Sequence, residues 1–325
     1  MSERPLPIPR AAGAPAELER ELRSAERYAQ SALAPATRRA YESDWRVFAD
    51  WCSERGVPAI PAAPAAVAAF LAAEADRGFR PVTIGRRAAA IAAAHRAQDH
   101  PNPCDSGAVA QVLSGIRRRH GTAPERRAAP LDLSPLEQVL AELDTSTLAG
   151  LRDRALLLLG FAAALRRSEL VTLDVEHLEF TTARGLLVRI ASSKTDQERA
   201  GATVAVPYAR AGNDRCAVRA LRAWLEAAGI HRGPVFRRMR RGDIVGAERL
   251  TGQSVALIVK RRSKAAGLGP EQLSGHSLRA GYVTAAAAAG VEERKIANVS
   301  RHKDLPVLRR YIRAATAFDD VGEVL

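Results

Sequence analysis

Residues 276–279 read His-Ser-Leu-Arg, and the same C-terminal stretch continues to a second histidine, His302, and to Tyr311. We expect this stretch to be a series of helices, with His276 and Arg279 facing the same way because they are three residues apart. A guanidinium and two imidazoles can hold the oxygens of a phosphodiester and move a proton while a phenol attacks phosphorus. The spacing therefore predicts phosphodiester chemistry that needs no metal ion and no other cofactor.

Length and composition constrain the number of domains, the fold class and the charge of the partner. A chain of 325 residues favours two domains. Aromatic residues make up only 5%, and alanine, leucine, arginine and glutamate are abundant, which predicts a mainly helical protein. The formal net charge of +13 favours a polyanionic partner. A general bias of the genome toward arginine and alanine is the alternative explanation of the charge.

The cysteines and the apolar segments limit the cellular setting. Cys52, Cys104 and Cys216 are odd in number and far apart, which argues against a disulfide framework and against a CxxC metal site. No apolar run approaches the roughly 18 residues that a membrane span requires. The first residues lack the apolar core of a signal peptide. We therefore expect a reduced, cytoplasmic protein without a membrane partner.

The first part of the chain predicts an all-helical domain. Four prolines among residues 1–23 predict a flexible N-terminal tail, and helices are expected through residues 24–120. The side chains Tyr41, Trp45, Phe48 and Cys52 recur at helical spacing and should share one buried face. Further helices are expected over 65–75, 82–97 and 109–119, separated by glycine and proline.

The rest of the chain predicts a second, mixed domain over residues 131–325, after a linker at 121–130 that is rich in proline and glycine. Ser134 is the expected N-cap of its first helix, with Glu137 completing a capping box. The runs 186–190 and 203–206 predict a small antiparallel β-hairpin. From about residue 215 only helices are expected. The fold class is thus mainly α with a small antiparallel β-sheet.

Further candidate groups for the chemistry lie upstream of the C-terminal motif. Arg166 follows a very apolar helix, and Glu169 is placed to orient its guanidinium. Lys194 lies between the two predicted strands, where a hairpin can carry an ammonium to a leaving oxygen.

Taken together, these motifs resemble those of the tyrosine recombinases, or phage integrase family. The resemblance rests on Leu165-Arg-Arg-Ser-Glu169, Ser193-Lys194-Thr, Gly275-His-Ser-Leu-Arg279, His302 and Tyr311, in family order and spacing. It covers about 131–325. The first domain resembles the helical core-binding, DNA-binding domain of that family more weakly.

The resemblance implies roles for these residues. Tyr311 would be the nucleophile that forms a 3′-phosphotyrosyl intermediate, and Arg166 and Arg279 would clamp the scissile phosphate. His276 would assist proton transfer from the tyrosine, and His302 would hydrogen-bond the phosphate. By the same resemblance Lys194 would be the general acid for the 5′-oxygen, and Glu169 would support the site. One position departs from the family pattern, because Arg301 stands where glycine usually precedes the second histidine.

The resemblance also implies a partner and an assembly. The expected function is site-specific DNA recombination, whether integration, excision or resolution, by a homotetramer on double-stranded DNA, with accessory proteins unknown. Relaxation of DNA by a type IB topoisomerase and DNA binding without catalysis are the alternatives. The candidate DNA contacts are basic residues of both domains, Arg38, Arg39, Arg86, Arg87, Arg237, Arg238, Arg240, Arg241, Lys260 and Arg261.

Overall fold

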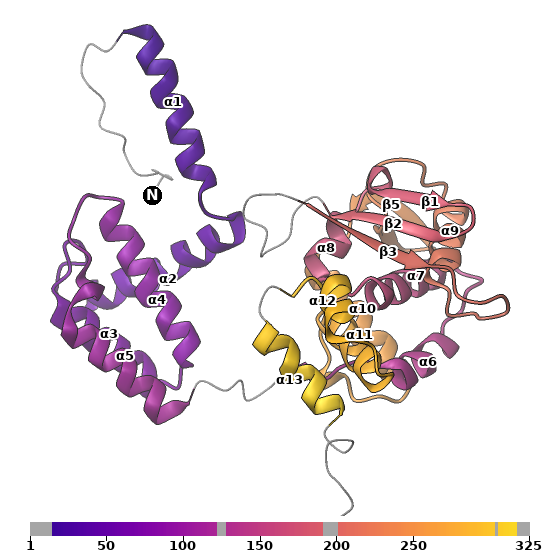
Figure 1. The fold of residues 1–325 in the computed structure, drawn as a ribbon. Coiled ribbons are helices and arrows are strands. Elements are labelled where there is room, and N and C mark those ends of the chain that lie inside the picture. Colours follow the sequence, from indigo (N-terminus) through magenta and orange to yellow (C-terminus); the bar gives the residue numbers. More distant parts are fainter. Residues whose placement is uncertain (1–14, 122–127, 191–200, 303–304, 317–325) are drawn as a thin grey trace, which may run out of the picture. The chain divides into compact units, whose positions relative to one another are not determined.

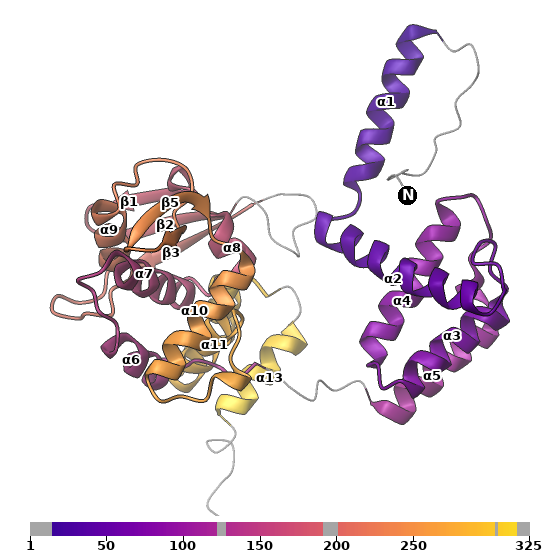
Figure 2. The same cartoon turned by 180° about the vertical axis from the view of Figure 1, so that it is seen from behind.

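The chain folds into two compact units that divide between residues 125 and 126, inside the stretch expected to be a linker. The computed structural model describes residues 15–121, 128–190, 201–302 and 305–316, and Figures 1 and 2 show it from two sides. Each unit is described by itself below.

The first unit is helical throughout its described residues. Its elements are α1 (Ala16–Ser31), α2 (Pro35–Glu54), α3 (Pro64–Asp76), α4 (Pro81–Arg96), the short 3-10 helix η1 (Pro103–Asp105) and α5 (Gly107–His120). Proline begins α2, α3 and α4, where its missing N–H leaves no hydrogen bond unmade. The structure corrects one expectation, because α1 begins at Ala16, within the predicted flexible tail. The residues from Ala16 onward are good helix formers, and all four prolines of the predicted tail come before them, so the prolines do not interrupt the helix.

A small aromatic and aliphatic core holds this unit together. Phe48 and Phe70 are fully buried with their ring centroids 5.1 Å apart, and Ile84 of α4 and Val109 of α5 join them. Of the predicted face of α2, Phe48 and Cys52 are buried in this core and Trp45 packs against it, whereas Tyr41 is only partly buried and lies outside it.

The second unit combines helices with two small sheets. Its elements are α6 (Leu133–Ala141), α7 (Leu148–Ala162), α8 (Arg167–Thr172), η2 (Val175–His177), β1 (Leu178–Thr181), β2 (Gly185–Ile190), β3 (Ala202–Pro207), α9 (Ala217–Ala227), β4 (Arg237–Arg240), β5 (Ile244–Arg249), α10 (Gly252–Ala265), η3 (Pro270–Gln272), α11 (Ser277–Ala288), α12 (Glu293–Ser300) and α13 (Leu305–Ala315).

The predicted hairpin is confirmed and has an additional neighbour. Strands β2 and β3 pair antiparallel, with Leu186 opposite Val206, and β1 pairs with the other edge of β2. Strand β1 has only four residues, which is too short for its alternation to stand out in the sequence.

A second hairpin, β4–β5, lies where only helices were expected, so that expectation was wrong. Gly242 and Asp243 both have positive φ, 84° and 59°, and this conformation suits the tight turn between two antiparallel strands. The Asp243 carboxylate also accepts hydrogen bonds from the backbone N–H groups of Leu148 (2.6 Å) and Ala149 (2.8 Å) at the start of α7. The turn therefore caps a distant helix, a role that is invisible in the local sequence.

The start of α6 differs from the expected capping box. The helix begins at Leu133 after Asp132, so Ser134 lies inside its first turn, and the Asp132 side chain makes no capping hydrogen bond. The backbone N–H of Leu131 donates to the carbonyl of Ser277 (2.9 Å). This contact fixes the chain immediately before α6.

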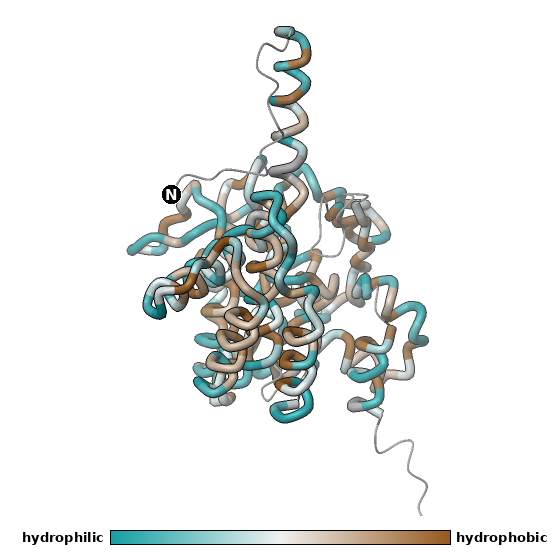
Figure 3. Tube along the Cα trace, turned by 90° about the vertical axis from the view of Figure 1, so that its left-hand side faces the viewer, coloured by the Kyte–Doolittle hydropathy of each residue, from teal (hydrophilic) through white to brown (hydrophobic). Residues whose placement is uncertain are grey.

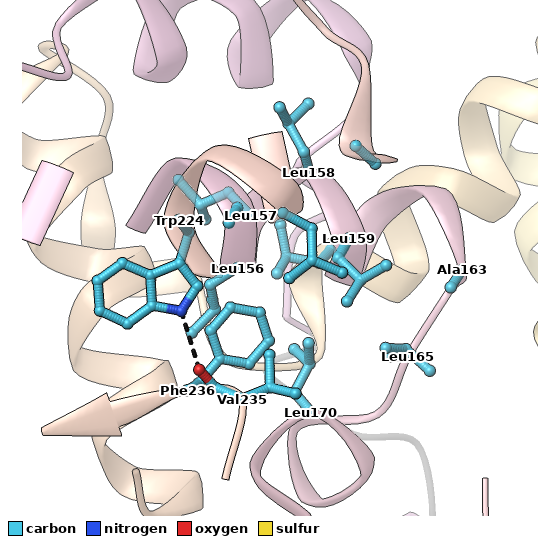
Figure 4. Packing of buried hydrophobic residues seen from close by; sticks show 14 of the residues in the cluster. Leu156, Leu157, Leu158, Leu159, Ala163, Leu165, Leu170, Trp224, Val235 and Phe236 are labelled. Atoms are coloured by element: carbon cyan, nitrogen blue, oxygen red, sulfur yellow. Dashed lines mark hydrogen bonds between the residues drawn. The ribbon is translucent and has the colours of Figure 1, made fainter. Parts of the chain in front are cut away.

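Helix α7 runs through the core of the second unit. Its four consecutive leucines, Leu156–Leu159, are all buried, and they pack beside Trp224 of α9 (Figure 4). The Trp224 indole N–H donates to the carbonyl of Val235 (2.9 Å), which satisfies its polar atom inside the core. Hydrophobic and hydrophilic residues are interspersed along the tube of the chain, as the brown and teal segments of Figure 3 show. Within the described residues, we find no helix with the length and apolarity needed to cross a bilayer.

Helix α11 approaches the chain before α6 so closely that Gly281 has no room for a side chain. A Cβ at this position would lie 1.9 Å from the carbonyl oxygen of Leu131. We predict that Gly281→Ala lowers the free energy of unfolding by about 1–3 kcal/mol, because backbone has to move. Denaturant unfolding measures this. The control is Gly252→Ala, where a Cβ would meet only the Arg167 side chain at 3.6 Å. Equal stability of the two variants would contradict the prediction.

Candidate active site

Arg166 lies in the turn between α7 and α8, and a buried carboxylate fixes it there. The turn begins at Ala164, which has a positive φ of 46°, and Arg166 is the N-cap of α8. Glu169 accepts hydrogen bonds from the Arg166 backbone N–H (2.8 Å) and from its Nη1 (2.7 Å). Only 1% of the Glu169 side chain is exposed. One carboxylate therefore both caps α8 and orients the guanidinium.

Arg279 is a buried cation with an unused donor. Its Nη1 donates to the carbonyl of Ala164 (2.9 Å), whereas its buried Nη2 has no hydrogen-bond partner among the described residues. Burial, followed by the charges of Arg166 and Arg301, lowers the pKa of Arg279 to about 9, which leaves it charged at neutral pH. Buried donors of native proteins are rarely left unpaired, so this nitrogen points to an anionic ligand.

His276 lies immediately before the helix that carries Arg279. Helix α11 begins at Ser277, so His276 is its N-cap and its side chain is exposed, while Arg279 lies in the first turn. The pKa of His276 is lowered, first because neighbouring protein atoms desolvate the ring and second because the Arg279 and Arg166 charges disfavour the imidazolium. A neutral imidazole at this position can accept a proton.

His302 is held by a serine two residues before it. The Ser300 hydroxyl donates to the carbonyl of Ile296 (2.6 Å) and lies 2.7 Å from Nδ1 of His302. Burial, followed by the charges of Arg279 and Arg166, lowers the pKa of His302 to about 4. Ser300 was not among the site residues predicted from the sequence, although its place two residues before the second histidine was the available signal.

Tyr311 is brought next to His302 by the packing of α13. Leu308 of α13 is fully buried against Val283 of α11 and Ile296 of α12, and Tyr311 packs against the edge of this cluster. The ring centroids of Tyr311 and His302 are 6.5 Å apart.

Arg301 also enters the site, which the sequence showed only as a departure from the family pattern. It follows α12 with a left-handed φ of 55°, and its side chain turns inward and pairs with Glu169. The structure thus brings Arg166, Glu169, His276, Arg279, His302 and Tyr311 into one region and adds Ser300 and Arg301. Lys194 lies outside the described residues. No group of three or more His, Cys, Asp or Glu side chains in the described ranges is arranged to hold a metal ion.

The candidate DNA contacts of the first unit divide into exposed and internal residues. Arg39 is exposed and Arg38 is partly buried. Arg86 is half-exposed and forms an ion pair with the buried Asp44 (2.6 Å). Arg87 is buried, contacts Glu74 and stacks over Phe79 at 4.1 Å. A buried and paired guanidinium cannot reach a DNA backbone, so the assignment of Arg87 is withdrawn.

Many of the basic residues of the second unit also have protein partners. Arg237 donates to the carbonyls of Pro234 (3.0 Å) and Arg232 (2.7 Å), and Lys260 is partly buried. Arg240 pairs with Glu248 (3.2 Å), and Arg261 pairs with the buried Asp153 (3.1 Å). Arg238 and Arg241 are exposed on the β4–β5 hairpin and remain the stronger candidates.

The known proteins that resemble this chain are integrases and recombinases. A model of the phage integrase family matches residues 131–317. The chain is 40% identical over 305 residues to an integrase/recombinase xerD homolog of Selenomonas ruminantium, covering 93% of this chain and 88% of the relative. It is 24% identical over 287 residues to the recombinase Cre of Escherichia phage P1, covering 82% and 81% of the two chains.

Solved structures share the fold. The Tn1549 transposon integrase in complex with transposon right end DNA has a TM-score of 0.58 at 17% identity, covering 88% of this chain and 94% of that chain. A lambda integrase dimer bound to a COC′ core site has a TM-score of 0.59 at 17% identity, covering 90% and 76%. The predicted fold class is confirmed.

The lowered pKa of His302 predicts a pH-dependent stability. Its pKa is about 4 in the folded protein against an ordinary value of 6.5, so the unfolded chain binds more protons between these values. The free energy of unfolding should therefore fall as the pH is lowered from about 6.5 toward 4. We expect His302→Gln to lose on the order of 1 kcal/mol less than the wild type between pH 7 and pH 5. Denaturant unfolding at the two pH values measures this, and equal losses would contradict it.

Proposed function

The chain belongs to the phage integrase family and is a tyrosine recombinase that acts by site-specific DNA recombination, and we propose that Tyr311 is its nucleophile. The observation that carries this proposal is the cluster of guanidiniums near the His302–Tyr311 ring pair, in which Arg279 keeps a buried Nη2 donor with no partner among the described residues. A phosphodiester oxygen would supply the acceptor that this donor needs.

Arg166 and Arg279 would hold the non-bridging oxygens of the scissile phosphate. Each guanidinium is already anchored through one nitrogen, Arg166 to Glu169 and Arg279 to the Ala164 carbonyl. Their remaining N–H groups can be offered to the phosphate without loss of this anchorage. As the pentacovalent transition state forms, extra negative charge develops on these oxygens, and fixed donors in a partly buried site stabilise it.

The proposed reaction has two steps of the same kind. The Tyr311 oxygen forms a bond to phosphorus, its proton passes to His276, and the bond between phosphorus and the 5′-oxygen breaks. Lys194, the candidate acid from the family resemblance, would protonate that oxygen. In the second step the 5′-hydroxyl of the partner strand bonds to phosphorus and gives its proton to Lys194, while the bond between phosphorus and Tyr311 breaks and His276 returns the proton to the phenol. The phosphodiester energy is kept in the covalent bond throughout, so ATP is not consumed.

His302 would donate to the phosphate through Nε2. Its Nδ1 contacts Ser300, whose hydroxyl can donate either to Nδ1 or to the Ile296 carbonyl. A bound phosphate favours the tautomer, or the cation, that carries a proton on Nε2. The added negative charge also offsets the arginine charges that lower the pKa of this histidine in the free protein.

The partner would be double-stranded DNA, bound at a specific site by four copies of the chain in the cytoplasm. Phosphate contacts from exposed basic residues of both units would supply the nonspecific part of the affinity. The named relatives are recombinases, so DNA relaxation as the main activity and a non-catalytic role are not favoured.

The covalent step predicts a protein–DNA adduct that depends on Tyr311. The wild-type protein is incubated with sheared and lightly nicked DNA from the genome that encodes it, and DNA that stays attached in denaturant is recovered and sequenced. A nick near the site lets the cleaved fragment diffuse away and traps the intermediate. We expect recurrent fragments that define a site, and loss of the adduct by at least about a thousandfold in Tyr311→Phe.

Recovery of the same fragments with Tyr311→Phe would refute Tyr311 as the nucleophile. Tyr282→Phe is the matched control, because Tyr282 packs in the same unit against Phe161 and has no proposed catalytic role. This variant should form the adduct as the wild type does.

The division between exposed and internal arginines predicts different responses to salt. Arg39→Ala should weaken DNA binding and lower the slope of log affinity against log salt concentration by about one. Arg87→Ala should leave that slope unchanged and lower the free energy of unfolding, because it leaves the buried Glu74 without its internal cation. Fluorescence anisotropy over a salt series on the recovered duplex measures the slopes. An equal change of slope in both variants would contradict this division.

A further inference from the structure

We propose that Arg301 is a positioning residue, which neutralises Glu169 and so leaves the guanidinium of Arg166 available to the scissile phosphate. The inference rests on the proposed function, since it concerns the same site. It gives a role to the one position at which this chain departs from the glycine of the family pattern.

The backbone of Arg301 is in a conformation that favours glycine. It ends α12 with φ 55° and ψ 43°, the left-handed region, where an L side chain is strained. Glycine at this position would end the helix without strain. The arginine must therefore be retained by interactions of its side chain.

Among the described residues, the two terminal nitrogens of the side chain make four hydrogen bonds, all to protein acceptors, while the buried Nε has none. Its Nη2 donates to Oε2 of Glu169 (2.7 Å) and to the carbonyl of Ala164 (3.3 Å). Its Nη1 donates to the carbonyls of Ala163 (3.1 Å) and Val299 (2.6 Å). The guanidinium thus joins the end of α12 to the end of α7 and to the start of α8.

These acceptors are the ones that also hold the two proposed phosphate-binding arginines. Glu169 is shared between Arg166 and Arg301, because Oε1 faces Arg166 Nη1 and Oε2 receives the Arg166 backbone N–H together with Arg301. The Ala164 carbonyl is shared between Arg279 and Arg301. Arg301 therefore contacts both anchors, and its contact with Glu169 (2.7 Å) is closer than its contact with the Ala164 carbonyl (3.3 Å).

The charges of the cluster support the same role. Three guanidiniums and one carboxylate leave two net positive charges for the phosphate, and removal of Arg301 would leave one. Burial raises the pKa of Glu169, but the Arg301 charge and the Arg166 hydrogen bonds outweigh it and hold that pKa below its ordinary value. Without Arg301, the full carboxylate charge would act on Arg166 alone and compete with the phosphate for its donors.

Arg301 acts through its contacts with Glu169 and the backbone, without touching the DNA. Its side chain is only 12% exposed, and both terminal nitrogens are engaged by protein. A direct phosphate contact would require it to abandon Glu169. The expected signature is a slower reaction with little change in DNA affinity.

The test is a double-variant comparison with Arg301→Gly and Glu169→Gln on the duplex recovered through its Tyr311 adduct. Glycine suits the backbone, so the fold should survive the change. Arg301→Gly should slow single-turnover adduct formation by about tenfold or more, with DNA affinity within about twofold. In the Glu169→Gln background the same substitution should change the rate by less than about twofold, because the charge that it neutralises is gone.

An equal effect of Arg301→Gly in both backgrounds, or a loss of affinity as large as the loss of rate, would overturn the proposal. Arg301→Lys provides a second check, because an ammonium can still pair with Glu169. It should retain more activity than Arg301→Gly, and equal activities would contradict the charge argument. Lys295→Ala, on the exposed face of the same helix, is the control and should react as the wild type does. Failure of the wild type to form a Tyr311-dependent adduct would instead refute the proposed function.

Discussion

The buried carboxylate of Glu169 is the interaction on which the rest of the site depends. Guanidiniums gathered around one point repel one another, and burial makes that repulsion stronger than it would be in water. Glu169 offsets it by accepting from Arg166 and Arg301 at the same time. Its position three residues after Arg166 also caps α8, so the electrostatic partner and the local fold are set by the same side chain.

The C-terminal end of α7 is the second support of the site. The carbonyls that follow the helix have no further helical N–H to accept, and here they receive Arg279 and Arg301. The other end of α7 is capped by Asp243 from the β4–β5 turn. Because Leu156–Leu159 of this helix are buried in the core, a well-packed element holds the carbonyls to which the two cations are anchored.

The grouping of the candidate site residues could be predicted from sequence because several of them have local spacings and their chemistry is distinctive. His276 and Arg279 fall at the start of one helix, and the pair of Arg166 with Glu169 follows from a three-residue separation. The helical first unit and the β2–β3 hairpin were equally accessible. The β4–β5 hairpin was not, because its turn residue Asp243 is fixed by a contact with α7, 94 residues away in the chain.

The sequence could not predict which basic residues are exposed and which are paired within the protein. Arg86 and Arg87 are adjacent and chemically identical, yet one is half-exposed and the other is buried against Glu74. Arg261 is likewise engaged by the buried Asp153. Part of the positive net charge is therefore neutralised by ion pairs within the protein. Arg301 appeared in the sequence only as a missing glycine, and its role required the three-dimensional partners of its side chain.

The most direct test of the account is the structure of the Tyr311→Phe protein bound to its recovered duplex. The distances of interest join the guanidinium nitrogens of Arg166, Arg279 and Arg301 to the scissile phosphate. The account predicts that Arg166 and Arg279 lie about 3 Å from its non-bridging oxygens while Arg301 stays on Glu169. A phosphate held by Arg301, with Arg166 turned away toward Glu169, would contradict it.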